Sequence, residues 1–439
     1  MVTSSWLDIY QQKRMEADSA ASLIQDGMQV FITGNSAVPM DILTALAKTL
    51  PGRRGIRLVQ PFTAGPMPYL HPEYFENLRV NTLFISPNIR EAVNTGQADF
   101  TPVLLSELPL LFKKGVITLD VSLLHLSPPD EDGYCTYGTD IGLVRTAAES
   151  SGLKIAQINP QMPATRGETK IHISELDAIV EVDKPLYEIP VMPANNNPIV
   201  ERIADFVSEL IPDGATLQLG IGEIPNAIAH RLTHKKNLGI HSELISDGMM
   251  ALVEAGAINN SEKTLHPGVL TAGFLFGSHA LYRWADQNPV IELQRTEYIN
   301  HPFTIARNSK MTAINAAIEV DLTGQVCADS IGSEFYSGAG GQADFIYGAS
   351  LSEGGLPVIV LPSSYQMRDG TRCSRIAVQL KPGAGVITTR NHVHYVATEY
   401  GIVDLYGKSI AQRVKSLISI AHPNFRDELT YSARELRWI

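Results

Sequence analysis

Residues 211–225 read IPDGATLQLGIGEIP, and this stretch is typical of the repeating unit of an α/β protein. An Asp-Gly turn precedes the apolar run at 216–219, and Gly220 and Gly222 follow that run. Pro225 has a fixed φ that suits the first turn of a helix. The order therefore predicts the end of a helix, a turn, a buried strand, a glycine loop and a new helix.

A similar arrangement occurs in the first half of the chain, where residues 24–39 read IQDGMQVFITGNSAVP. Both copies have an Asp-Gly turn, an apolar run, and then a glycine and a proline, which are Gly34 and Pro39 in the first copy. The match is short and needs a gap, so the repeat is weak. It nevertheless favours two similar α/β domains in tandem.

Other apolar runs of strand type alternate with helical patterns, such as the pattern at 41–47, along the whole chain. The runs lie at 28–32, 82–85, 116–119, 153–158, 358–361 and 386–389. Such alternation with short Gly/Pro turns predicts α/β domains, each with a mostly parallel sheet covered by helices.

The length of 439 residues also favours two domains. Residues 190–198, PVMPANNNP, are rich in breakers and poor in core residues, as expected of a linker. We therefore predict an N-terminal domain at 1–189 and a C-terminal domain at 199–439. Ligand clefts of such proteins tend to lie between the domains, at the carboxyl ends of strands.

The composition excludes several classes of partner. The formal net charge of −11 leaves no basic stripe for nucleic acid, although it does not exclude a small phosphorylated ligand. No apolar run approaches the ~20 residues needed to cross a membrane, and the N-terminus lacks a secretory signal. The three cysteines, Cys135, Cys327 and Cys373, have no paired spacing. We expect a cytoplasmic protein without disulfides or a zinc site.

Glu243, in the segment GIHSELISDG at 239–248, is the candidate catalytic residue. We expect an apolar strand to end at Ile240, and Asp247 to cap a helix over 249–253. A glutamate ionised at neutral pH can attack a thioester without a base, and the amides of the glycine turn at 220–222 can hold an oxyanion. A solvated loop glutamate and a purely structural turn are the alternatives. Binding of NAD would need a third glycine where Pro225 stands.

A second glycine-rich segment, SGAGGQADF at 337–345, allows a ligand to approach the backbone closely, whereas a flexible surface loop is the alternative. Asp344 is expected to brace this loop. His392 and His394 have the alternate spacing of a strand, but no third ligand is evident and we predict no metal. Five cations could meet ligand phosphates, with surface exposure as the alternative for each. They are Arg307, Lys310, Arg372, Arg375 and Arg390.

At these residues the chain resembles the family I coenzyme A transferases. It is most similar to the branch of 4-hydroxybutyrate and butyrate/acetate CoA-transferases, which includes acetyl-CoA hydrolase-like proteins and itaconate CoA-transferases. The resemblance covers essentially the whole chain. The segments that carry it are 127–130, 172–175, 218–224, 239–248, 319–326, 329–332, 338–344, 398–401 and 420–423.

The resemblance implies the site. Glu243 falls on the family's catalytic glutamate, which forms a glutamyl-CoA thioester. The CoA-binding positions that it implies are Gly220, Ile221, Gly222, Glu223, Ile224, Asn315, Gly338, Gly340 and Gly341. CoA and acyl-CoA are substrates, and no cofactor is bound permanently. The segments at 31–39 and 58–66 depart from the family's pattern, so the acid accepted is open; Phe62 and Phe84 are candidate pocket walls.

The predicted function is therefore transfer of CoA from acetyl-, butyryl- or succinyl-CoA to a short-chain acid by a ping-pong route. The candidate acceptors are 4-hydroxybutyrate, butyrate and itaconate. An acyl-CoA hydrolase on the same fold is the alternative, and we expect a homo-oligomer, a dimer.

Overall fold

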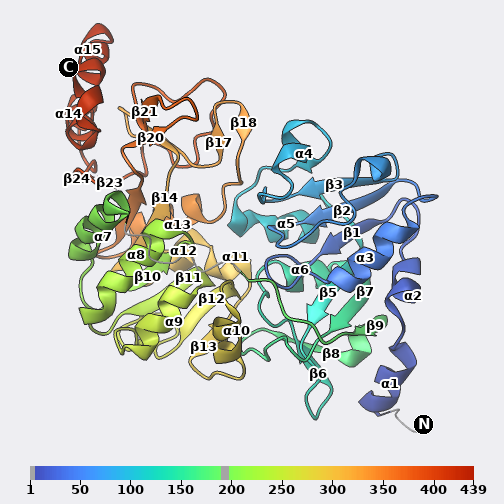
Figure 1. Cartoon of the computed structure of the whole chain (residues 1–439). Coiled ribbons are helices and arrows are strands. Elements are labelled where there is room, and N and C mark those ends of the chain that lie inside the picture. Colours follow the sequence, from blue (N-terminus) through green and yellow to red (C-terminus); the bar gives the residue numbers. More distant parts are fainter. Residues whose placement is uncertain (1–4, 189–196) are drawn as a thin grey trace. The chain divides into compact units, whose positions relative to one another are not determined.

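The computed structural model describes residues 5–188 and 197–439 (Figure 1). Contacts divide these residues into two compact units. The first comprises 5–188, 243–247 and 271–299, and the second comprises 197–242, 248–270 and 300–439. Most of the predicted linker lies at 189–196, outside the described residues, so the domain limits at 189 and 199 stay predictions.

The first unit is built on a seven-stranded sheet in the order β4-β3-β2-β1-β5-β7-β9. All its neighbouring strands are parallel. The order reverses between β1 and β5, as in a doubly wound sheet. The strands are β1 (Gln29–Ile32), β2 (Ile56–Gln60), β3 (Leu78–Thr82), β4 (Asp99–Phe100), β5 (Leu119–Leu126), β7 (Ser151–Ile158) and β9 (Ala178–Glu181).

Successive side chains of each strand lie on opposite faces of this sheet, as the pleat requires. Val30 and Leu58 belong to a buried cluster with Ile42 and Leu46 of helix α3. Phe31 packs instead on Phe112 of helix α5, with the ring centroids 5.7 Å apart. The helices are α1 (Trp6–Lys13), α2 (Ala17–Ser22), α3 (Met40–Thr49), α4 (Arg90–Asn94), α5 (Leu108–Lys113) and α6 (Val144–Glu149); β6 (Tyr134–Thr136) pairs with β8 (Lys170–His172).

A second sheet has eight strands in the order β13-β12-β11-β10-β14-β19-β23-β24. Its central pairs are parallel, and β24 is antiparallel to β23. The strands are β10 (Thr216–Leu219), β11 (Gly239–Ile245), β12 (Leu270–Leu275), β13 (Ile291–Leu293), β14 (Met311–Ala316), β19 (Leu356–Val360), β23 (Tyr395–Thr398) and β24 (Gly401–Asp404).

Helices flank these strands in the second unit (Figure 1). Helix α7 begins after Asn197, whose side chain accepts a hydrogen bond from the Ile199 amide, and Pro198 occupies the first helical position. A buried cluster joins Ile359 and Val396 to Val414 and Leu417 of α14. The helices are α7 (Pro198–Leu210), α8 (Glu223–Arg231), α9 (Asp247–Glu254), α12 (Pro302–Ala306), α13 (Gln342–Leu351), α14 (Ile410–Ile420) and α15 (Arg426–Glu435). The predicted α/β class with mostly parallel, helix-covered sheets is confirmed.

The strand predicted at 82–85 is misplaced, because β3 ends at Thr82. Thr82 pairs with Gln60, the last residue of β2, and the next residue is Pro61. The Leu83 amide still donates to the Gln60 carbonyl oxygen at 2.8 Å, but β2 ends at Gln60 and offers β3 no further partner. The apolar pattern at 82–85 reflects burial of Leu83 and Ile85 beyond the strand.

Two other predicted strands differ from the structure. The run at 116–119 belongs mostly to the turn after α5, where Val116 is 68% exposed, and β5 begins only at Leu119. The run at 386–389 forms no strand; Thr388 alone makes a bridge, to Val326. Among the described residues, no helix combines the length and apolar character needed to cross a membrane.

Candidate active site

Glu243 is the fifth of the seven residues of β11. The prediction that this strand ends at Ile240 is wrong, because Leu244 and Ile245 are buried and continue the strand. Glu243 is half-buried between fully buried neighbours. A carboxylate on a regular strand has a fixed backbone, so the structure gives the candidate nucleophile a defined position.

The backbone of Glu243 leaves no room for a side chain at Gly273 of β12. A Cβ atom at Gly273 would lie 3.2 Å from the Glu243 carbonyl oxygen. The amides of Ile141 and Gly142 donate to the Gly273 carbonyl oxygen at 3.2 and 3.0 Å. Glycine at 273 therefore permits close packing beside the candidate nucleophile.

Asp247 follows β11 and is itself the first residue of α9. The prediction that it caps a helix over 249–253 is therefore wrong. Its carboxylate accepts hydrogen bonds from the amide of Ser278, at 3.0 Å, and from the Ser278 hydroxyl. Asp247 thus anchors the start of α10 (His279–Ala285) in the first unit.

The glycine turn after β10 has an open backbone. Gly222 adopts φ +124° and ψ −178°, a conformation essentially restricted to glycine, and it is the N-cap of α8 without a side-chain hydrogen bond. A Cβ atom at Gly220 or Gly222 would meet no atom within 4 Å, and Ile221 is 42% exposed. Helix N-termini leave amides without intrahelical partners, so this turn can bind an anion.

Asn315 lies beside the glycine turn in the second unit. Its side-chain amide donates to Gln218 Oε1 at 3.0 Å, and the Gln218 amide donates back to Asn315 Oδ1 at 3.3 Å. Both side chains are buried. Because β10 pairs with β14, Asn315, a predicted CoA-binding residue, is held against Gln218, two positions before Gly220.

The second glycine segment leads directly into α13, with Gly341 as the N-cap and Gly340 at φ +55°. Asp344 is buried in the first turn of this helix, which packs against β14. Gln342 donates to the Thr388 hydroxyl at 3.2 Å. The segment is therefore the start of a packed helix rather than a free surface loop.

The predicted site residues are divided between the two units. Glu243 falls in the first unit, whereas Gly220–Ile224, Asn315 and the glycines at 338, 340 and 341 fall in the second.

His392, His394 and Phe62, which the sequence singles out, contact other aromatic rings. The ring centroids of His392 and Tyr347 lie 4.6 Å apart, and those of His394 and Tyr406 lie 4.4 Å apart. Within residues 5–188 and 197–439, no group of three His, Cys, Asp or Glu side chains could hold a metal ion.

Phe62 and Phe84 are the candidate pocket walls. Their ring centroids lie 5.9 Å apart, and Phe62 also packs on Phe276.

The sequence did not reveal a buried acid in the first unit, Asp140, which lies close to Gly273. Asp140 is 3% exposed, and Asn35 Nδ2 donates to its Oδ2 at 2.6 Å. Asp140 also makes a backbone bridge to Phe274, the residue after Gly273. Burial raises the pKa of Asp140 to about 7, against the lowering effect of Asn35. An aspartate in a polar stretch gives no sequence signal for such burial.

This pKa predicts how stability depends on pH. The unfolded aspartate has a pKa near ~3.9, so between about pH 4 and 7 the folded state binds more protons and stability falls as pH rises. Asp140→Asn keeps an acceptor for Asn35 without a charge. We expect it to be more stable than wild type by about 2–4 kcal/mol at pH 8 and equal at pH 4.

Thermal denaturation across this pH range measures the effect. Asp26→Asn, at an exposed turn of the same unit, is the matched control and should follow the wild-type profile. Parallel profiles for Asp140→Asn and wild type would show that Asp140 is not the buried acid responsible.

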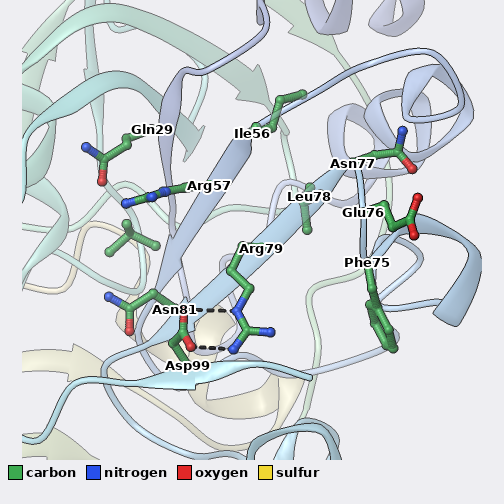
Figure 2. A pocket seen from close by; sticks show the side chains of 12 residues that line it. Gln29, Ile56, Arg57, Phe75, Glu76, Asn77, Leu78, Arg79, Asn81 and Asp99 are labelled. Atoms are coloured by element: carbon green, nitrogen blue, oxygen red, sulfur yellow. Dashed lines mark hydrogen bonds and ion pairs between the residues drawn. The ribbon is translucent and has the colours of Figure 1, made fainter. Parts of the chain in front are cut away.

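Two of the hollows in the described part of the first unit have no predicted site residue in their lining. One has a volume of about 430 Å³ and lies over β1–β4 (Figure 2). Gln29, Arg57 and Arg79 form a row across adjacent strands, and hydrogen bonds from Arg79 lower the pKa of Asp99. Arg79 is therefore already paired with Asp99, and Arg57 is a second cation in the lining.

The other hollow, about 490 Å³, lies where the sheet order reverses between β1 and β5. His125 forms part of its lining, and its Nδ1 contacts the Val38 carbonyl oxygen at 3.2 Å. Side-chain amides of Gln157 and Asn159 contact its Nε2. Burial lowers the pKa of His125 to about 4, so the ring is neutral at pH 7.

Comparison with known proteins places the chain in a family. The acetyl-CoA hydrolase/transferase N-terminal domain matches residues 6–193, and the C-terminal domain matches 277–433. The chain is 44% identical to the 4-hydroxybutyrate coenzyme A transferase of Clostridium kluyveri, over 97% of this chain and 98% of the relative. It is 41% identical to the succinyl-CoA:cyclohexane-1-carboxylate CoA transferase of Geobacter metallireducens, over 98% and 97%.

Among solved structures, RipA from Yersinia pestis matches with a TM-score of 0.93 and 32% identity, over 99% of this chain and 100% of RipA. The chain therefore belongs to the acetyl-CoA hydrolase/transferase family and is an enzyme of the CoA-transferase class. The expected acyl-CoA and carboxylic acid substrates fit the CoA transferases among its relatives.

Proposed function

We propose that this enzyme transfers CoA from an acyl-CoA donor to a short-chain carboxylic acid through a covalent adduct on Glu243. The observation that carries the proposal is the half-buried carboxylate of Glu243 on a strand whose other residues are buried. Strand β10, which leads into the open turn at 220–222, pairs in parallel with β11, so the two strands run in the same direction. The similarity to the Clostridium kluyveri enzyme favours 4-hydroxybutyrate as the acceptor.

The first half-reaction forms the enzyme adduct. The Glu243 carboxylate attacks the thioester carbonyl carbon, and amides at 220–224 stabilise the developing oxyanion. The C–S bond then breaks, CoA thiolate leaves, and a mixed anhydride remains. The thiolate attacks the glutamyl carbonyl carbon, which releases the donor's acid as a carboxylate and leaves a glutamyl-CoA thioester.

The acceptor carboxylate reverses these steps. It attacks the glutamyl thioester and displaces CoA thiolate, which then attacks the acyl carbonyl of the new anhydride. Glu243 leaves as a carboxylate, and the acceptor departs as its CoA thioester. One thioester is exchanged for another, so the route needs no ATP and no permanently bound cofactor. The anhydride must be shielded from water, because hydrolysis would consume the donor.

Intact-protein mass spectrometry tests the proposal. Wild type incubated with acetyl-, butyryl- or succinyl-CoA and no acceptor should gain the mass of CoA minus water. Hydroxylamine should remove the adduct, and adding 4-hydroxybutyrate should discharge it to 4-hydroxybutyryl-CoA. Release of free acid with no adduct and no acceptor would contradict transfer and identify a hydrolase. Butyrate and itaconate are further acceptors to compare, and the cytoplasmic location and the homodimer stay predictions.

A further inference from the structure

A positively charged segment stands out in this acidic chain. Residues 361–394 contain five Lys or Arg residues and one carboxylate, Asp369, whereas the whole chain has a net charge of −11. The five cations are Arg368, Arg372, Arg375, Lys381 and Arg390. Across the described residues, none of the five makes an ion pair with a carboxylate within 4.0 Å. The segment therefore presents cations without a direct ion pair, although Glu319 lies near enough to Arg375 and Lys381 to favour their charged forms.

Two of these cations share one aromatic ring. Tyr365 lies on β20 (Ser364–Gln366), which pairs with β21 (Arg372–Ser374) immediately before Arg375. The Arg375 guanidinium carbon is 5.1 Å from the centroid of the Tyr365 ring, and Lys381 Nζ is 5.3 Å from it. Lys381 Nζ also donates to the Tyr365 hydroxyl at 3.1 Å. The ring thus holds both cations in defined positions.

One hydrogen-bond donor of the Arg375 side chain has no partner in the described part of the chain. Its guanidinium donates to the Ile318 carbonyl oxygen at 2.9 Å, while its Nε is buried and has no hydrogen-bond partner. Desolvation lowers the pKa of Arg375, although Tyr365, Tyr336 and Glu319 act in the opposite direction. Hydrogen bonds between a guanidinium and an anionic phosphate are charge-assisted and stronger than neutral ones, so an anion that reached the outer nitrogens of this half-buried side chain would be bound well.

The cations lie beside both segments that are expected to contact CoA. Ile318, which accepts from Arg375, comes two residues after β14, the strand that carries Asn315. Tyr336, which lies near enough to Arg375 to influence its pKa, comes two residues before Gly338. All these residues belong to the second unit.

We infer that Arg375 and Lys381, held on Tyr365, bind the phosphates at the nucleotide end of the acyl-CoA substrate. The ligand chemistry is a phosphate monoester or diphosphate, which the planar guanidinium and the ammonium both recognise. The inference rests on the proposed function, and it assigns to CoA recognition two residues that take no part in the chemistry at Glu243.

Calorimetry with three ligands on the full-length enzyme tests this assignment. The ligands are CoA, dephospho-CoA and pantetheine, which carries no phosphate. We expect Arg375→Gln and Lys381→Met each to bind CoA about 10- to 100-fold more weakly than wild type, with pantetheine affinity unchanged. Arg375→Lys, which keeps the charge, should recover part of the loss. Arg368→Gln, at an exposed position of the same segment, is the matched control and should bind CoA as wild type does.

The three ligands also identify the phosphate. A loss seen with both CoA and dephospho-CoA supports contact with the diphosphate, and a loss seen only with CoA supports contact with the 3′-phosphate. In activity assays the variants should raise KM for acyl-CoA and leave kcat nearly unchanged, as expected when ground-state and transition-state binding fall equally.

Failure of the inference can be distinguished from failure of the transfer mechanism. Wild-type affinity for CoA in Arg375→Gln and Lys381→Met, or an equal loss of CoA and pantetheine, would overturn the phosphate assignment. Phosphate-dependent CoA binding by wild type without any adduct on Glu243 would overturn the mechanism and leave the phosphate assignment standing.

Discussion

Replacing Glu243 with Gln is expected to lower kcat for CoA transfer by about 10⁴-fold or more. The carboxamide has nearly the same shape but cannot attack a thioester, so neither the anhydride nor the glutamyl-CoA thioester can form. Because Glu243 is only half-buried on β11, we expect the free energy of unfolding to change little. Steady-state transfer assays, together with intact mass after incubation with acyl-CoA, measure the loss directly.

Two further variants sharpen this test. Glu243→Asp withdraws the carboxylate by one methylene and should lower kcat by about 10²-fold, because misplacement by about 1 Å has that cost. Glu254→Gln, at the exposed end of α9, is the matched control and should behave as wild type. A CoA adduct on Glu243→Gln would show that another residue is the nucleophile.

Gly222→Ala is expected to give the second-largest effect, a fall in kcat of about 10²–10³-fold. A Cβ atom at this position would meet no neighbour, so the cause is not a steric clash with other residues. The cause is the backbone at φ +124°, which alanine adopts only at a cost of about 1–3 kcal/mol. The turn should relax, and the amides that hold the oxyanion should move away from their working positions.

A second strained glycine separates catalysis from stability. Gly407 has φ +69°, and a Cβ atom there would also meet no neighbour, but it lies in a turn outside the candidate site. Gly407→Ala should lower the melting temperature, since alanine is disfavoured in the left-handed region, with kcat unchanged. Equal kcat values for Gly222→Ala and wild type would remove this turn from oxyanion stabilisation.

Much of the fold followed from local pattern. The strands β1, β7, β10 and β19 and the helix α3 were predicted because each is a buried run bounded by turn residues, so its signal is contained in neighbouring positions. The errors came from the neighbouring strand or turn. β3 ends early because the adjacent β2 ends at Gln60, and the run at 386–389 makes a single bridge. Such effects depend on residues far away in the sequence.

The candidate site also has features that the sequence predicts and features that only the fold reveals. Glu243 and the glycine turn were identifiable because a carboxylate and exposed amides suit acyl transfer by their own chemistry. The Asn35–Asp140 hydrogen bond and the Arg375–Tyr365–Lys381 cluster were not identifiable as arrangements, since their partners are separated along the chain. Only the fold shows that Asp140 is buried and that one ring holds two cations.

The position of Glu243 within a β-ladder also constrains enzyme kinetics. A nucleophile on a strand cannot swing between two chambers, so on the proposed route donor and acceptor must each come to one fixed carboxylate. The departing acid and the incoming acid would then occupy the same volume and exclude each other. Such an enzyme should show competitive inhibition between the free acid and the acyl-CoA for the unmodified form, with parallel double-reciprocal plots when the acceptor is varied.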